Sequence, residues 1–453
     1  MSAPQPLTRA SIFAQAWPIM LGQASIPLVG VVDAAIIGRT GDVAALAGVA
    51  LGATIISLIF WSFGFLRMGM TGLTAQAKGS GNSGEVDALL LRALLIGFAL
   101  GLLILLLQWP LREGAFALLA GGEDVTAQAS QYVTARFFGA PAALCFFAIN
   151  GWLLGLGRTR EALVLQLVMN IVNIIADIAL VWGMGLGALG VGIGTALAEW
   201  AALLTGLVIA GRVAGSGIIA LIRCTPRRSI TNPAALGRLF AVNRDIMIRT
   251  LALLAMFTWF ANAGARLGAR ELAANHILLQ FINLAAFVLD AFAFTAEARV
   301  GQAIGARDKR AFFRSIRLAG EFSLLSGALL ALVFMAVGGM VIGVITTDAQ
   351  VREEALRFLP FAALVPLIGM PSWMLDGIFI GATRGRALRN AAVIAALLYL
   401  ALDFALRPYG NMGVWLAISA GYVLRAGALG AYLPRLVQDI ETGEAAKHLD
   451  ENP

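Results

Sequence analysis

A series of apolar runs, each long enough to cross a bilayer as a helix, constrains this chain more than any other feature. The runs recur from end to end, and only 13% of the residues are charged, which is about half the share of an average soluble protein. None of the runs alternates apolar with polar residues as the strands of a membrane barrel do. We therefore predict an all-α integral membrane protein with twelve transmembrane helices. The expected spans cover residues 12–37, 44–75, 86–108, 125–155, 161–183, 188–211, 239–265, 271–303, 313–345, 351–381, 387–406 and 411–433.

Basic residues gather in alternate loops between these spans. The basic loops contain Lys78; Arg158 and Arg160; Arg212, Arg223, Arg227, Arg228 and Arg238; Arg307, Lys309, Arg310 and Arg314; and Arg384, Arg386 and Arg389. The opposite loops are more acidic and contain Glu113, Glu123, Asp124, Asp348, Glu353 and Glu354. Because cytoplasmic loops carry the excess of Lys and Arg, we expect a multi-pass membrane protein with both termini in the cytoplasm. This topology explains the net charge of +7, so the expected partner is the lipid bilayer and not nucleic acid.

The chain consists of two similar halves, residues 1–211 and 239–453, joined by a cytoplasmic linker at 212–238. A shift of 226 residues aligns Gln76–Gly79 with Gln302–Gly305, Gly151–Gly155 with Gly377–Gly381, and Asp177 with Asp403. Each half contains six spans, so the halves have the same orientation and are predicted to form two pseudo-symmetric six-helix bundles. Transporters built from such repeats bind their substrate between the halves and work by alternating access.

Asp33 is the only charged residue between Arg9 and Arg39. An ionised carboxylate inside a bilayer is costly, so such a group takes up a proton or finds a partner. Four polar residues of the first half lie at similar depth: Asp33, Asn173, Asp177 and Thr195. Counting about 1.5 Å per residue, all are within about 6–15 Å of the outer boundary. They are predicted to form one hydrogen-bonded cluster that couples transport to H⁺, or alternatively to Na⁺. In the other interpretation, each is satisfied separately in the packing.

The second half is not equivalent to the first. A shift of 229 residues places Asn262 on Asp33, so the first acid has no counterpart. Asp403 remains, and Arg407 lies four residues after it, at the spacing of an ion pair on one helix face. Ion coupling is therefore expected in the first half.

Further polar residues of the spans have two interpretations each. Asp290 and Asp376, together with Glu297, can attract cations to the inner half of the membrane. Alternatively, they form ion pairs with arginines close to them in sequence, and these pairs act as a cytoplasmic gate or anchor. The nearby arginines are Arg299, Arg384 and Arg386. Asn150 can line a cavity, although a single amide also serves as a contact between helices.

The first span contains Pro18 and Gly22, which interrupt its backbone hydrogen bonding below Asp33. The functional interpretation is a helix that bends when Asp33 changes its charge. The alternative is a static kink that neighbouring helices fill.

No catalytic or nucleotide-binding motif accompanies these features. The sequence has no His-Glu-x-x-His, no Cys/His metal cluster, no P-loop and no nucleophile elbow. We therefore expect a secondary active transporter without a cofactor, driven by an ion gradient. An intramembrane enzyme that uses Asp33 and Asp177 as an acid pair is the alternative from another class.

Several motifs resemble the multidrug and toxic compound extrusion (MATE) family, and more narrowly its DinF-like (DNA-damage-inducible F) branch. The acid in Val31–Gly38 and the pair in Asn173–Asp177 carry the resemblance to the family. The stretches similar to the branch are Phe65–Gln76, Asn243–Met247, Leu289–Glu297, Gly301–Asp308 and Leu375–Arg384. The similarity extends from about residue 7 to residue 435.

This resemblance implies a pair of six-helix lobes that expels amphipathic, often cationic small molecules in exchange for H⁺ or Na⁺. It implies a role in cation coupling for Asp33 and a hydrogen-bond network of Asn173, Asp177 and Thr195. Pro18 and Gly22 match the place where the first helix bends. Sodium-coupled relatives carry a glutamate in the seventh helix, and residues 251–264 contain no acid, which favours protons. A sodium-coupled exporter and a flippase for lipid-linked precursors remain the alternatives, and a monomer is expected.

Overall fold

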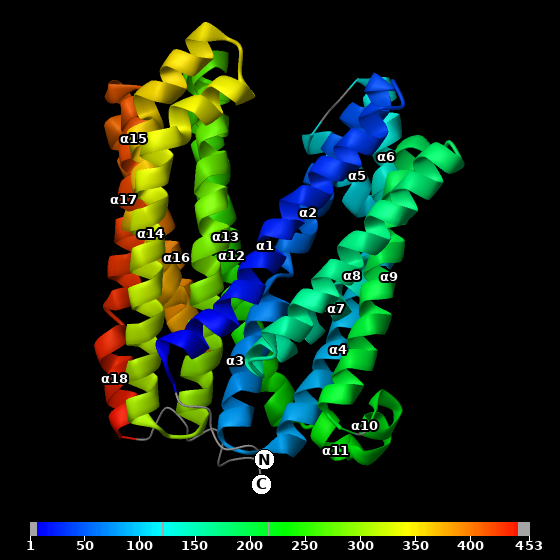
Figure 1. Ribbon diagram of the computed structural model, residues 1–453, viewed down its shortest axis with the longest axis vertical. Helices are drawn as coiled ribbons and strands as arrows, with labels where there is room; N and C mark the ends of the chain where they lie inside the picture. The colour runs from blue at the N-terminus through cyan, green and yellow to red at the C-terminus, as the bar shows by residue number, and fades with distance from the viewer. Residues whose placement is uncertain (1–6, 120–121, 216, 443–453) are drawn as a thin grey trace. The chain divides into compact units, whose positions relative to one another are not determined.

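The structure is a computed structural model that describes residues 7–119, 122–215 and 217–442. Within these ranges the chain is helical and contains no strand (Figure 1). The helices of the first half are α1 (Arg9–Gly38), α2 (Val43–Ser62), α3 (Phe65–Gly79), α4 (Ser83–Leu106), α5 (Gln108–Leu118), α6 (Glu123–Phe137), α7 (Ala140–Gly155), α8 (Thr159–Asp177), the π-helix η1 (Ile178–Gly183) and α9 (Gly187–Val213). They are followed by α10 (Ile218–Cys224), α11 (Arg227–Ile230), α12 (Pro233–Leu267), α13 (Ala269–Gly305), α14 (Lys309–Ile345), α15 (Ala349–Gly381), α16 (Gly385–Leu406), η2 (Arg407–Tyr409), α17 (Asn411–Gly430) and α18 (Leu433–Glu441).

The predicted number of membrane spans is confirmed. In the described ranges, 11 helical segments are long and apolar enough to cross a membrane. The helices α6 and α7, bent by 54° at a short break, pass the same test together and make twelve if they count as one span. Several spans begin at a side chain that caps the first turn and satisfies its backbone N–H groups. Asp42, for example, accepts a 2.8 Å hydrogen bond from the backbone N–H of Ala45, and Asp308 accepts one of 2.9 Å from that of Ala311.

Contacts divide the described residues into two compact units. Unit 1 comprises those in Met1–Met20, Ala75–Gly81 and Phe240–Pro453, and unit 2 those in Leu21–Thr74 and Asn82–Leu239. Both α1 and α3 therefore pass from one unit to the other as continuous helices.

Unit 1 is a bundle in which α13 and α15 form the most extensive helix pair, with α14 and α17 packed beside them (Figure 1). Its apolar core includes edge-to-face ring pairs, such as Phe260 with Trp415 at 5.2 Å between ring centroids. Glycines allow the close approach of α15 to α13, because a Cβ at Gly377 or Gly381 would overlap the backbone of α13.

A second close crossing in unit 1 uses residues that the internal repeat aligns. A Cβ at Gly79 of α3 would overlap the carbonyl oxygen of Gln302, and one at Gly305 of α13 would overlap that of Gln76. The two helices thus meet through the same Gln-x-x-Gly pattern from both sides. The Gln76 amide also donates a 2.9 Å hydrogen bond to the Gly381 carbonyl.

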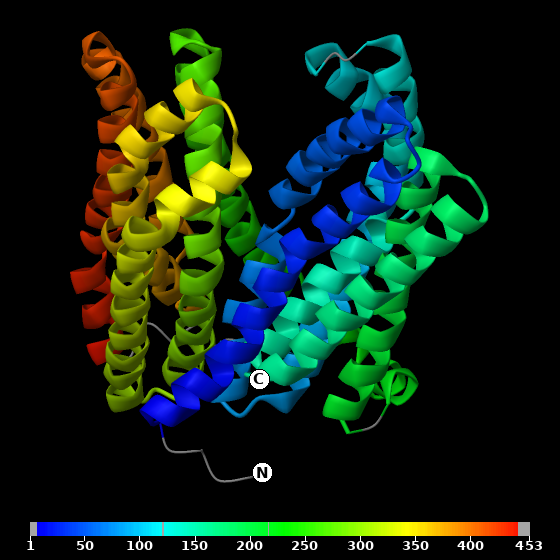
Figure 2. The same ribbon diagram turned by 45° about the horizontal axis from the view of Figure 1, so that its top comes forward.

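In unit 2, α2 packs on α6, α4 packs on α7, and α8 packs on α9. The expected linker is partly helical, and its α10 and α11 lie against α9 and α4 (Figures 1 and 2). Arg92 of α4 holds this segment: its Nε donates a 2.9 Å hydrogen bond to the Ser229 carbonyl, and its guanidinium group forms a 2.6 Å salt bridge to Glu85.

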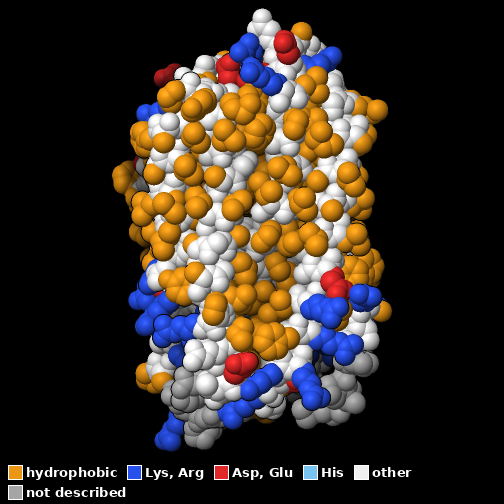
Figure 3. All heavy atoms as spheres, turned by 90° about the vertical axis from the view of Figure 1, so that its left-hand side faces the viewer, with side chains coloured by type: hydrophobic (Ala, Val, Ile, Leu, Met, Phe, Trp, Pro, Cys, Tyr) orange, Lys and Arg blue, Asp and Glu red, His pale blue; other side chains and the backbone are white. Residues whose placement is uncertain are grey.

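A broad apolar band covers one side of the molecule, with Lys and Arg concentrated near its lower end (Figure 3). Exposed side chains of α14 are among those that give unit 1 its apolar surface, including Leu325, Leu329, Leu332, Met340 and Val344. Such a surface suits contact with lipid and not with water.

Candidate functional site: a buried acid pair in unit 2

The structure brings together the four residues of the predicted cluster. Asp33 on α1 and Asp177 on α8 lie close enough for their carboxyl groups to act on each other electrostatically. The Asn173 amide donates hydrogen bonds to Thr195 Oγ1 at 3.0 Å and to Asp177 Oδ2 at 3.4 Å. Asp177 is fully buried, whereas Asp33 is 9% exposed. Neither carboxyl group forms a salt bridge within the described ranges, which distinguishes this pair from the other buried acids below.

Local helix geometry holds the two acids in place. Directly after Asp177, α8 widens into the π-helix η1, whose Trp182 side chain donates a 3.0 Å hydrogen bond to the Ile36 carbonyl of α1. Deeper along α8, Asn170 donates a 2.9 Å hydrogen bond to Ser25 of α1. These two contacts fix the register of α1 against α8.

Sequence reasoning missed part of α8. Gln166 and Asn170 are buried and joined by a 2.9 Å hydrogen bond, so a polar stripe extends from Asp177 through Asn173 toward the other end of the helix. The signal was present in the sequence, since these residues recur at intervals of three and four.

A glycine on α9 makes room for Asp177. A Cβ at Gly194 would overlap Asp177 Oδ1, so we expect Gly194→Ala to displace this carboxyl group and to lower stability by about 1–3 kcal/mol through overpacking. The melting temperature of the detergent-purified protein measures the effect. Gly114→Ala on α5 is the control, because a Cβ there meets no atom within 4 Å. Equal melting temperatures for the two variants would contradict the packing argument.

A buried ion pair lies beside the cluster, and sequence reasoning missed it too. Arg136 of α6 and Glu199 of α9 are 2.8 Å apart, with side chains that are 8% and 7% exposed. Arg136 acts electrostatically on both Asp33 and Asp177. A charge of each sign inside the expected spans 125–155 and 188–211 was the available signal.

The predicted bend of the first helix stays a prediction. Pro18 and Gly22 both lie within α1, which continues as one helix from Arg9 to Gly38. Pro18 has no backbone N–H, so the helix lacks one of its internal hydrogen bonds at that point. A Cβ at Gly22 would only touch Leu163 at 3.8 Å, so the packing does not require glycine there. Asn150 is half-buried on α7.

In unit 1, Asp376 of α15 is buried between Arg249 of α12 and Arg425 of α17 and forms salt bridges to both. Pairing of this acid with Arg384 or Arg386 is therefore wrong. Both of those residues are close in sequence, but Arg384 binds Asp439 at 2.6 Å. The partners of Asp376 come from α12 and α17, because its side chain is buried inside the bundle that these helices form with α15.

Arg299, Asp290 and Glu297 have further contacts within unit 1. Arg299 donates a 2.6 Å hydrogen bond to Gln15, and Asp290 and Glu297 act electrostatically on Arg249.

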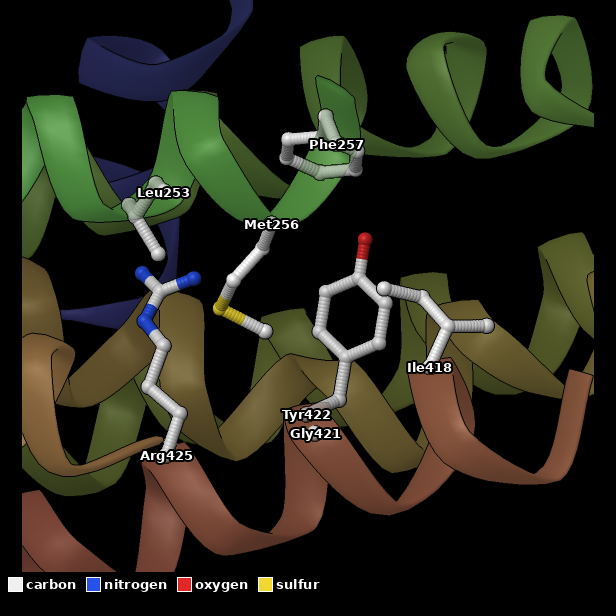
Figure 4. A pocket seen from close by; sticks show the side chains of 7 residues that line it. All are labelled: Leu253, Met256, Phe257, Ile418, Gly421, Tyr422 and Arg425. Carbon is white, nitrogen blue, oxygen red and sulfur yellow. The ribbon is translucent and has the colours of Figure 1, made fainter. Parts of the chain in front are cut away.

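The Arg425 side chain closes one end of a small pocket between α12 and α17, with Met256, Phe257 and Tyr422 along its walls (Figure 4).

The expected ion pair of Asp403 with Arg407 is present, but another arginine lies closer to this carboxylate. Arg266 of α12 binds its carboxylate at 2.9 Å, and the Trp259 indole donates a second hydrogen bond of 2.9 Å. Arg407, at i+4, is farther away at 3.8 Å. Asn262, which replaces the first acid, only accepts a 3.4 Å hydrogen bond from Arg266.

Comparisons with known proteins agree with this architecture. Residues 18–179 and 246–405 match the MatE family model. The chain is 36% identical to the DNA damage-inducible protein F of Escherichia coli K12 over 92% of this chain and 90% of that protein. It is 24% identical to the probable multidrug resistance protein NorM of Acinetobacter baylyi, over 90% of this chain and 92% of that protein.

A solved structure has the same fold. A MOP superfamily transporter from Pyrococcus furiosus superposes with a TM-score of 0.86 at 18% identity, covering 97% of this chain and all of that one. The family model covers most of the chain, and a relative above 30% identity spans nearly all of it. The protein therefore belongs to the MatE family of multidrug efflux transporters, which are multi-pass membrane proteins and not enzymes.

Proposed function

We propose that this protein exports amphipathic, cationic small molecules from the bacterial cytoplasm in exchange for protons, and that Asp33 takes up and releases the proton. The observation that carries the proposal is the buried pair of Asp33 and Asp177, whose carboxyl groups act on each other and form no salt bridge in the described residues. Two such groups in a medium of low dielectric constant repel each other when both are ionised, so the doubly ionised state is unfavourable. The pair is therefore suited to hold a proton and to exchange it.

The two acids have different roles in this proposal. Asp177 is fully buried and accepts a hydrogen bond from Asn173, which Thr195 also binds, so its position is fixed. Asp33 retains 9% exposure and is carried by α1, which contains Pro18 and Gly22. We therefore assign the exchange of the proton to Asp33, and a bend of α1 at Pro18 and Gly22 to the change of state.

The second half supports the choice of protons over sodium ions. Asp376 is bound by two arginines and Asp403 by Arg266 and Arg407, so each of these carboxylates already has cationic partners. Carboxylate oxygens that are occupied by guanidinium groups are poor ligands for a sodium ion. No acid occurs in residues 251–264 of α12 to complete a sodium site there.

The proposed cycle joins these parts. In the outward-facing state, Asp33 binds a proton from outside, α1 shifts, and the cationic substrate leaves. The inward-facing state releases the proton to the cytoplasm and binds new substrate. A difference of one pH unit across the membrane supplies about 1.4 kcal/mol per exchanged proton, enough for about tenfold accumulation. We further propose that the protein is a monomer of the inner membrane. Its termini are proposed to be cytoplasmic, because the basic residues lie in the loops of one side.

Efflux from proteoliposomes tests this function. A fluorescent monovalent cation is loaded, and gradients of H⁺ and Na⁺ are imposed separately. We expect a proton gradient alone to drive transport and a sodium gradient alone to leave the rate at background. Transport driven only by sodium would exclude proton coupling. Movement of a lipid-linked precursor without movement of the cation would identify a flippase instead.

A further inference from the structure

Beside the acid pair of unit 2 lies a charge pair that the proposed cycle does not use. Arg136 and Glu199 are both buried, at 7% and 5% exposure. Their side chains meet at 2.8 Å between α6 and α9. A buried ion pair is weak evidence for stability, because the cost of removing both charges from water offsets their attraction. Its position therefore calls for another explanation.

The fold makes space for this pair. A Cβ at Gly139, in the bend between α6 and α7, would overlap Glu199 Oε2. The guanidinium group of Arg136 lies 5.4 Å from the centre of the Phe60 ring on α2, and the Tyr132 hydroxyl contacts it from one turn earlier on α6. Glu199 and Arg136 are thus held from several sides.

Electrostatic contacts join the ion pair to the acid pair. The charged and titratable groups that face Arg136 are Asp33 from α1, Tyr132 from α6, Asp177 from α8 and Glu199 from α9. Three carboxyl groups therefore share one guanidinium, which stays charged at any physiological pH. Glu199 is in direct contact with Arg136 and neutralises its charge, whereas the two aspartates form no salt bridge with it.

The charge count has a consequence for coupling. With Arg136 and Glu199 mutually neutralised, the site has a charge of zero when both aspartates are protonated and minus one when they share one proton. A charge of minus two would require two facing buried carboxylates, the least favourable state. One proton is therefore retained, and a single proton is exchanged.

Building on the proposed function, we propose that Arg136 and Glu199 are a positioning pair that limits the Asp33–Asp177 site to one exchanged proton per monovalent cation. The site is then neutral with its second proton bound, and neutral again when a singly charged substrate replaces that proton. In both halves of the cycle, the site together with the proton or substrate that it binds therefore has no net charge when it changes its access.

Charge-neutralising variants test this role through the pH at which efflux from proteoliposomes is half-maximal. In Glu199→Gln, Arg136 lacks its partner and favours ionised aspartates, so the midpoint is expected to move to lower pH by roughly one unit or more. In Arg136→Gln the remaining negative charge should move it to higher pH. The double variant restores the balance and should return to the wild-type midpoint.

Two controls separate charge from structure. Arg136→Lys keeps the charge and should keep the midpoint even if the rate falls. The double variant Arg92→Gln/Glu85→Gln removes another ion pair of unit 2, in which Arg92 is buried and holds the linker, and should leave the midpoint unchanged. Shifts of both single variants in the same direction, or unchanged midpoints, would overturn the proposed role of the pair.

The wild-type protein provides a measurement that does not depend on the folding of any variant. With a monovalent cation, a membrane potential imposed by valinomycin and K⁺ should leave the proton-driven rate unchanged. Acceleration by an inside-negative or an inside-positive potential would show a net charge movement and exclude one-for-one exchange. A wild-type protein without proton-driven efflux refutes the proposed function itself. Normal proton coupling with unmoved variant midpoints refutes only the role of Arg136 and Glu199.

Discussion

Asp33→Asn is expected to abolish pH-dependent efflux while leaving the protein folded and inserted. The amide has the size of the carboxyl group and can still contact Asp177, but it binds and releases no proton. Proton-driven efflux from proteoliposomes should therefore fall to the level of empty liposomes at every pH. Circular dichroism and size-exclusion chromatography in detergent should match the wild type.

Two further variants sharpen this test. Asp33→Glu keeps a titratable group and should retain part of the proton-driven rate. Asp87→Asn on α4 removes a half-buried carboxyl group of the same unit outside the cluster and should have little effect on efflux. If Asp33→Asn exports at the wild-type rate, the role assigned to Asp33 is wrong.

Asp376→Ala is expected to have the largest effect on stability among single changes in unit 1. Asp376 is the carboxylate that Arg249 and Arg425 share, and all three side chains are buried. Removing one partner of a buried ion pair leaves charge without compensation, at a cost of roughly 3–5 kcal/mol. We expect a sharply lower yield of membrane-inserted protein and a lower melting temperature in detergent.

The matched control for this prediction is an exposed pair of the same unit. Glu321 binds Arg9 at 2.9 Å, with side chains 34% and 71% exposed, and such pairs contribute only about 0–1 kcal/mol. Glu321→Ala should therefore melt close to the wild type. A melting temperature of Asp376→Ala within a degree of that control would show that the two arginines find other partners in the bundle, such as Asp290 or Glu297.

Within the site, the depth of a polar residue along its helix was predictable from the sequence, and its partner was often not. Asn173 and Asp177 share a helix face by their spacing alone, and their hydrogen bond follows from it. The Arg136–Glu199 pair joins two helices, and each residue alone is merely an uncommon charge in an apolar run. The direction in which each helix turns its polar face depends on its neighbours.

The sequence by itself determined the twelve apolar spans, the repeat and the isolation of Asp33, because hydrophobicity and helix periodicity act within a single segment. Only the tertiary structure decided which charges meet. Asp376 binds Arg249 and Arg425, which are 127 and 49 residues away, and Asp403 binds Arg266 at a separation of 137 residues. Partners nearby in sequence, Arg384 for the first acid and Arg407 for the second, were the wrong or the weaker choice. In a bundle, a buried charge is compensated by the helix that packs against its face, and that helix can come from any point along the chain.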